Sequence, residues 1–242
     1  MLALFTVGCG AGTVYNWTVH TKSTPIAASL QPGRLNQDTT AIFTPIASGG
    51  LRGSEAGLGQ SLGDVMREAT PSWKVMEEQQ VISLLNRHGL ASDYTRMRSD
   101  AEQSGILDVA LLRKMGQALG ARYAFQPRLA FFSQEMTDRF TFPALNIRFS
   151  HTRSSLLRLS LQLWDTESGE LLWASAAEAE LESEGVSQEP VQLDAAARVT
   201  LGGMLADFLR RRTASHYTSL DKSLDSLIRL PTPDSEANQG KE

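Results

Sequence analysis

The four histidines are the first residues to examine for chemistry, because imidazole serves both as a general base and as a metal ligand. They are His20, His88, His151 and His216, and no two of them stand at the spacing of a helical ligand pair. His20 and His216 fall in polar terminal segments, and His88 falls at an expected helix end, where a cation complements the dipole. The sequence therefore predicts no catalytic centre, no metal site and no bound cofactor.

Two further patterns have a structural explanation. The glycine-rich stretch 49–59 separates a short β-rich run from a helix, as phosphate-binding loops do, but it lacks Gly-Lys-Ser/Thr and is better explained as a flexible loop. Four glutamates alternate along one expected strand and therefore share a face; they are Glu178, Glu180, Glu182 and Glu184. This spacing predicts a solvated outer face that discourages unwanted strand pairing.

Cys9 is the only cysteine of the chain, and it follows an apolar run that ends in Val7-Gly8. This arrangement resembles the lipobox of a bacterial lipoprotein signal, in which the cysteine becomes the first residue and carries lipid. Thr6 stands where leucine is usual and no basic residue precedes the run, so the signal looks truncated or its start misassigned. We expect Cys9 to be acylated; the alternative is a frayed apolar terminus with a chance thiol.

The amino-acid composition limits the kinds of molecule that we expect this chain to bind. The chain has 242 residues, a net charge of −4 and 21% charged residues, which is ordinary for a globular protein. The longest basic run is Arg210–Arg212, so we expect no nucleic-acid surface. No stretch approaches the ~20 apolar residues that a membrane-spanning helix needs.

Hydrophobic periodicity divides the chain into four parts: a truncated lipoprotein signal at 1–9, a flexible tether at 10–37, a folded body at 38–212 and a polar, disordered tail at 213–242. Within the body, helices are expected over 58–69, 77–90, 92–104, 108–120 and from 189 onward, and strands over 40–46, 73–76 and 122–132. Residues 156–182 alternate around a turn and predict a β-hairpin. This order of elements predicts an α/β (α+β) layer sandwich built on a single sheet.

Residues 133–155 connect two expected strands and carry alternating apolar residues. These are Phe140, Phe142, Leu145, Ile147 and Phe149. Their spacing predicts an extended hairpin that projects beyond the core, with an interaction surface for a neighbouring subunit or a membrane. The alternative is that both arms pack on the protein's own core.

Three segments resemble the family of envelope lipoproteins that includes CsgG, the TolB N-terminal domain, LpoB and PelC. Trp73–Asn86 resembles a strand that leads into a helix, Leu119–Tyr123 resembles a helix-to-strand turn, and Leu161–Trp173 resembles the hairpin with an Asp-x-x-x-Gly turn. The resemblance covers roughly residues 39–212. The chain departs from it in two ways: Glu77 or Glu78 stands where relatives often have an arginine, and the second apolar hairpin of a CsgG-type pore is not evident.

The resemblance implies a domain that faces the periplasm, is held at the outer membrane by lipid on Cys9 and is often assembled into oligomers. Such domains act by binding other envelope or secretion proteins and are not enzymes. We therefore expect an accessory component of an envelope or secretion complex. Two alternatives stay open: a subunit of a ring-forming, CsgG-like secretion channel, and a periplasmic enzyme or small-ligand-binding protein.

Overall fold

The computed structural model describes residues 14–31, 33–47, 51, 53, 57–141, 148–185 and 193–219. The strands are β1 (Val14–Ser23), β2 (Thr39–Ile42), β3 (Ile46–Ala47), β4 (Lys74–Met76), β5 (Tyr123–Thr141), β6 (Arg148–Asp165), β7 (Leu171–Gly185) and β8 (Ala214–Ser219). The helices are α1 (Arg34–Gln37), α2 (Leu58–Ala69), α3 (Glu78–Arg87), α4 (Ala91–Ser104), α5 (Val109–Leu119) and α6 (Leu193–Arg210).

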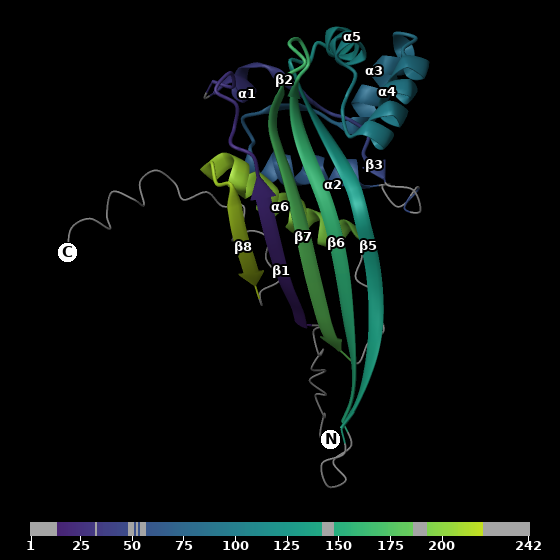
Figure 1. The fold of residues 1–242 in the computed structure, drawn as a ribbon, viewed down its shortest axis with the longest axis vertical. Coiled ribbons are helices and arrows are strands. Elements are labelled where there is room, and N and C mark those ends of the chain that lie inside the picture. The colour runs from purple at the N-terminus through teal and green to yellow at the C-terminus, as the bar shows by residue number, and fades with distance from the viewer. Residues whose placement is uncertain are drawn as a thin grey trace, which may run out of the picture.

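All of these strands belong to one eight-stranded sheet (Figure 1). Its order is β4-β2-β5-β6-β7-β1-β8, and β3 pairs with β5 beside β2. The short strands β2, β3 and β4 run parallel to their neighbours, whereas β5, β6, β7, β1 and β8 are antiparallel to one another. A single mixed sheet with helices packed on it confirms the predicted α/β fold class.

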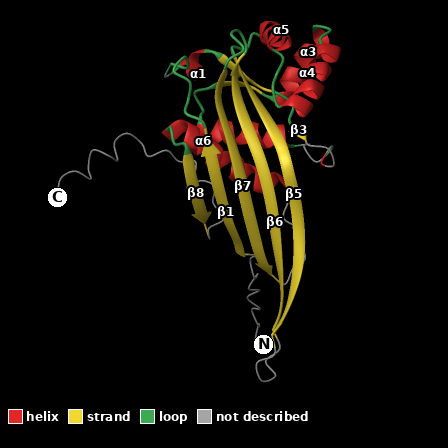
Figure 2. Ribbon diagram, in the orientation of Figure 1, coloured by secondary structure: helices red, strands yellow, loops and turns green. Residues whose placement is uncertain are grey.

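The helices divide between the two faces of the sheet. Helices α2 and α6 contact each other, and α6 crosses β1, β6 and β7, where Val19, Leu161 and Leu205 belong to one buried core. Helices α3, α4 and α5 gather at one end of the other face, over β2 and β3, and enclose a second core that contains Met97 and Leu112 (Figure 2). Among the described residues, the second face is therefore covered only at that end.

The expected hairpin 156–182 is present as part of β6 and β7. Its turn is held by Asp165, whose carboxylate accepts hydrogen bonds from the backbone N–H groups of Glu167 and Ser168, both at 2.9 Å. Arg122 pairs with the same carboxylate at 2.7 Å. Gly169 closes the turn with a φ of 79°, a conformation that glycine adopts without a steric penalty.

Two terminal strands correct the sequence-based interpretation. β1 lies within the expected tether 10–37, and β8 lies within the expected disordered tail 213–242. β1 pairs with β7 on one side and with β8 on the other, and Trp17 and Val19 are buried under α6. Exposed polar residues alternate with these apolar ones, so the segment has the period of a strand even though its overall composition is that of a linker.

Pro127 lies inside β5. Proline is usually confined to edge strands and bulges, because it cannot donate a hydrogen bond to the ladder. β5 is central, between β2 and β6, and the register shift lies further on, between Leu129 and Phe131. On the β2 side, β5 pairs with β2 as far as Phe125 and resumes pairing with β3 at Arg128, so Pro127 lies in the gap between two short partner strands.

Tyr94 links the second core to the chain that follows β2. Its ring packs edge-on against Phe43, with 5.7 Å between centroids, and its hydroxyl accepts a hydrogen bond from the backbone N–H of Thr44 at 2.7 Å. Burial raises the pKa of this phenol above its ordinary value of 10.0. The ionised form is therefore excluded from the folded state more strongly than from the unfolded state.

We expect the free energy of unfolding to fall as the pH rises above about 10, by up to about 1.4 kcal/mol per pH unit for each such tyrosine. The sign follows because the unfolded chain loses the phenolic proton first. Tyr217 contributes in the same direction but less, since burial raises its pKa as well while solvent reaches part of its side chain. Denaturant unfolding between pH 8 and 11.5 tests this, and the double variant Tyr94→Phe/Tyr217→Phe should give a shallower slope. Equal slopes in wild type and variant would contradict it.

No helix in the described ranges is long and apolar enough to cross a membrane.

Candidate interaction surface

The part of the sheet that α3, α4 and α5 leave uncovered presents a broad, polar surface, which we call the open face. It is formed by β5, β6, β7, β1 and β8, on the side opposite α6 (Figure 1). Alternation along each strand determines which residues it carries. On β7, for example, Ala177, Ala179 and Leu181 are buried under α6, while Glu180 and Glu182 point the other way and are exposed.

One row of side chains crosses this face from strand to strand. The residues are directly opposed in register, and in order across the sheet they are Phe131, Arg158, Glu178, His20 and His216. We call this set the cross-strand row. It connects all five strands of the open face, and directly opposed side chains are the pairs that interact most closely in an antiparallel sheet.

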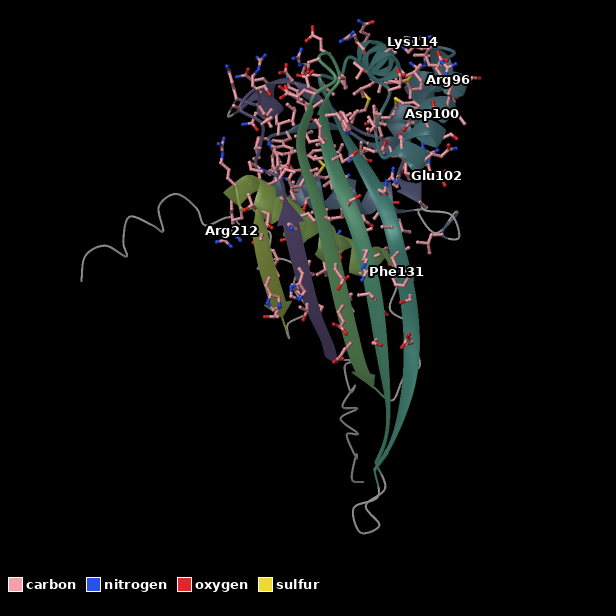
Figure 3. The ribbon with its side chains drawn as sticks, viewed as in Figure 1. Arg96, Asp100, Glu102, Lys114, Phe131 and Arg212 are labelled. Carbon is pink, nitrogen blue, oxygen red and sulfur yellow. The ribbon has the colours of Figure 1, made fainter. Side chains whose placement is uncertain are left out.

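The members of the cross-strand row contact one another. The Arg158 guanidinium lies over the Phe131 ring, 5.6 Å from its centroid, and its Nε donates to the Glu178 carboxylate at 2.5 Å. Phe131 is 39% exposed, and it is one of the few large apolar side chains that the described part of the chain presents to solvent (Figure 3). Arginine over an aromatic ring is attracted to the π-face and keeps the ring in one orientation.

His20 and His216 form the other end of the row. Their rings stack with 4.1 Å between centroids and 19° between planes. The sequence placed these histidines in a tether and a tail, 196 positions apart, and no spacing rule pairs residues at that distance. The alternation of Thr18, His20 and Lys22 with buried residues was the one local signal that could have placed His20 on an exposed strand face.

Next to the row the open face is acidic. Glu135 and Glu182 both oppose Ser154 on β6. Glu180 lies two residues before Glu182 on β7, opposite Leu156. All three carboxylates are exposed, and no basic side chain pairs with them in the described ranges. We call Glu135, Glu180 and Glu182 the acidic patch. The expected solvated outer face of the β7 glutamates is confirmed for the residues whose side chains are described.

A buried carboxylate fixes the two strands that complete this surface. Asp207 on α6 is fully buried, and it accepts hydrogen bonds from Ser215 at 2.6 Å, from Tyr217 at 2.5 Å and from Thr21. Thr21 belongs to β1, and the other two donors belong to β8. Three hydroxyl donors replace the water that an ionised carboxylate needs, so α6 holds both strands from the covered side.

Most of the residues expected to form sites lie outside this surface. Cys9 lies outside the described residues, and so do Phe142, Leu145 and Ile147. Phe140 and Phe149 are directly opposed near the end of the β5–β6 ladder, which confirms that 133–155 is a hairpin. Whether its apolar residues meet a membrane or a neighbouring subunit stays a prediction.

One pattern was overlooked in the sequence. Residues 59–63 read Gly-Gln-Ser-Leu-Gly, which is the Gly-x-Ser-x-Gly arrangement of a nucleophilic elbow. Here the segment lies inside α2, and Ser61 is only 5% exposed. An elbow requires a sharp turn between a strand and a helix, so this serine has the wrong backbone setting for a nucleophile. Within the described ranges, no three His, Cys, Asp or Glu side chains converge as metal ligands.

Comparison with known proteins gives structural likeness only, because no family and no curated protein matches the sequence. A PelC dodecamer from Paraburkholderia phytofirmans shares 9% identity over 76% of this chain and 94% of that one, with a TM-score of 0.38. Lipoprotein GNA1162 from Neisseria meningitidis shares 15% identity over 72% and 96%, with a TM-score of 0.42. The LpoB C-terminal domain from Salmonella enterica shares 14% identity over 63% and 86%, with a TM-score of 0.36. Likenesses of this size assign no function to the chain.

Proposed function

We propose that this protein is a lipid-anchored, non-enzymatic component of a bacterial envelope or secretion complex, held at the outer membrane through Cys9. In this proposal it binds another protein through the open face. The observation that carries it is the cross-strand row, an ordered set of side chains that the fold leaves uncovered. Its arginine–aromatic pair is of the type enriched where proteins meet.

The shape of the open face favours protein binding over catalysis or the binding of a small molecule. Small-molecule sites are concave and mostly apolar, with a few convergent polar groups. The open face is a broad strand surface whose polar groups already pair with each other, as in Arg158 with Glu178. Beside them, the acidic patch provides unpaired negative charge, so the partner surface that it fits is a cationic one.

The proposed location at the outer membrane is tested with the full-length protein in a bacterial host. We expect the wild type to fractionate with the outer membrane and to carry acyl chains on Cys9 by mass spectrometry. The variant Cys9→Ser should lose the lipid and leave the membrane fraction almost completely, because a single thioether-linked anchor has no substitute among the described residues. An unmodified thiol in membrane-bound wild-type protein would refute the proposed anchor.

The binding role is tested by capturing partners on the membrane-anchored protein. We expect the double variant Glu180→Lys/Glu182→Lys to lose a specific partner, with an affinity on the order of tenfold lower at moderate salt. The matched control is Asp100→Lys/Glu170→Lys, which makes the same change in net charge at exposed positions. Asp100 lies on α4 (Figure 3), and Glu170 lies in the turn between β6 and β7.

The control variant should keep the partner at wild-type affinity. Equal capture by all three proteins would remove the open face from the proposal. Conductance across a planar bilayer by the purified oligomer would favour the alternative role of a secretion-channel subunit.

A further inference from the structure

A small pocket lies at the C-terminal end of α6, where the connection from β1 to α1 passes this helix. It has a volume of about 210 Å³. Its lining residues are Ile26, Leu30, Gln31, Gly33, Leu35, Asn36, Trp73, Phe208, Leu209 and Arg211. Six of them are apolar, and the single charged residue is Arg211. The pocket therefore combines six apolar side chains with polar groups and one cation.

The apolar wall of the pocket is held rigidly. Trp73 stacks on Phe125 at 6.4 Å between centroids and meets Phe208 edge-on at 5.9 Å. Phe208 in turn packs edge-on against Trp173, at 5.0 Å. Phe125 and Trp173 are fully buried, whereas Trp73 is only partly buried, so one face of this aromatic cluster is available in the pocket. A wall built this way keeps its shape when the pocket is empty.

Arg211 has an unusual backbone conformation. Its φ is 53°, and no other non-glycine residue in the described ranges has a positive φ. The residue ends α6 in a Schellman arrangement, in which the N–H of Arg211 donates to the carbonyl of Phe208 at 3.2 Å and the N–H of Arg212 donates to that of Asp207 at 2.9 Å. Glycine is the residue that fits this position without strain, so arginine carries a cost in stability here.

The guanidinium of Arg211 receives no compensating ion pair from the described residues. The side chain is exposed, and no carboxylate pairs with it within the described part of the chain. A strained backbone that places an arginine in the wall of a pocket with six apolar side chains is the kind of outlier that points to a ligand.

We propose that this pocket binds a small amphiphile with one anionic group and a short apolar body, such as a medium-chain carboxylate. The anion pairs with Arg211, and the apolar body lies against Trp73 and Phe208. The size agrees, because a cavity of about 150 Å³ accommodates benzene, and this pocket is somewhat larger. This inference is independent of the open face and of the proposed function.

The experiment uses the full chain and sodium octanoate as the probe. We expect octanoate to bind saturably, with a Kd roughly in the range of 0.1–1 mM for about ten non-hydrogen atoms. Binding should shift the indole N–H signal of Trp73 in NMR spectra, and the variant Trp73→Phe assigns that signal. Octan-1-ol, which has the same chain without the charge, should bind at least about tenfold more weakly.

Two arginine variants separate the ligand role from the backbone cost. Arg211→Gly should raise the Tm by about 2–4 °C, since it relieves the strain, while it lowers octanoate affinity by at least about tenfold. Arg211→Lys should keep most of the affinity. Arg212→Gly is the matched control, because Arg212 follows directly but does not line the pocket, and it should leave octanoate binding unchanged.

Three results would overturn the proposal. They are no saturable binding of octanoate up to 10 mM, equal affinities for octanoate and octan-1-ol, and an Arg211→Gly variant that binds octanoate as wild type does. Because Arg211→Gly is expected to be more stable than wild type, a loss of binding in this variant does not reflect unfolding.

Discussion

Replacing Asp207 with alanine should lower the free energy of unfolding by about 3–4 kcal/mol. The carboxylate is fully buried and serves three hydroxyl groups on two strands, with hydrogen bonds from Ser215 and Tyr217 at 2.6 and 2.5 Å and a third from Thr21. Alanine removes the common acceptor of the buried Thr21 hydroxyl and of the half-buried Ser215 and Tyr217 hydroxyls. Each buried donor without a partner costs about 1–3 kcal/mol, and partial rearrangement keeps the sum below three full penalties.

Two milder variants test this explanation. Asp207→Asn keeps one acceptor oxygen and the side-chain volume, so we expect a loss of about 1–2 kcal/mol. Tyr217→Phe removes a single donor and leaves the carboxylate with its other two bonds, so its cost should also be about 1–2 kcal/mol. Denaturant unfolding at pH 7 measures all three.

Hydrogen exchange shows where the stability is lost. In Asp207→Ala, the amides of β8 and of the β8-facing side of β1 should exchange before those of β5 and β6, because α6 no longer holds the two outer strands. The stacked pair of His20 and His216 should then separate as well, since it depends on the β1–β8 register. A variant that unfolds at the wild-type denaturant midpoint would show that the carboxylate does not connect these elements.

The second large effect is expected at Gly116, inside α5. A methyl group there would lie 2.2 Å from the Thr166 hydroxyl oxygen and 2.4 Å from its Cβ, well inside contact distance. Thr166 is buried in the turn that joins β6 to β7, and its hydroxyl donates a hydrogen bond to the carbonyl of Ala121 at 2.7 Å. Gly116→Ala should therefore cost about 2–3 kcal/mol even after the gain in helix propensity, because the helix and the turn must move apart.

Gly63 in α2 is the matched control. The nearest atoms to a Cβ at this position are 3.7 Å away, which is an ordinary contact. Gly63→Ala should therefore stabilise the protein by about 0.5–1 kcal/mol, since it only removes the entropy cost of glycine in a helix. Thermal and denaturant unfolding of the two variants should give changes of opposite sign. Equal changes would mean that the close approach of α5 to the turn is not maintained in solution.

Local patterns were sufficient for most of the individual elements. The alternation that ends at Leu163 predicted a half-buried strand, because successive side chains of a strand point to opposite faces. The helix over 109–119 was predicted by its apolar stripe, by Asp108 at its start, whose carboxylate accepts from the N–H of Leu111 at 2.8 Å, and by Gly120 at its end. These signals operate within a few residues, and so they are visible in a single sequence.

The terminal strands were missed for a related reason. Residues 14–23 do alternate, but the segment around them is rich in glycine, threonine and proline, and this composition is typical of a linker. β8 is only six residues long, which is too short for a period to stand out. Both strands exist because β1 pairs with β7 on one side and with β8 on the other, and because α6 covers them.

The sequence by itself determined the fold class, the central hairpin and the lipobox-like setting of Cys9, because each depends on residues that are neighbours in the chain. Only the tertiary structure decided which surface stays open and which polar groups meet on it. Thr21 and Asp207 are 186 positions apart, and so no local period connects them. The cross-strand row likewise exists only when five strands are in register, and register is set by strand pairing and by burial under α6, not by any one segment.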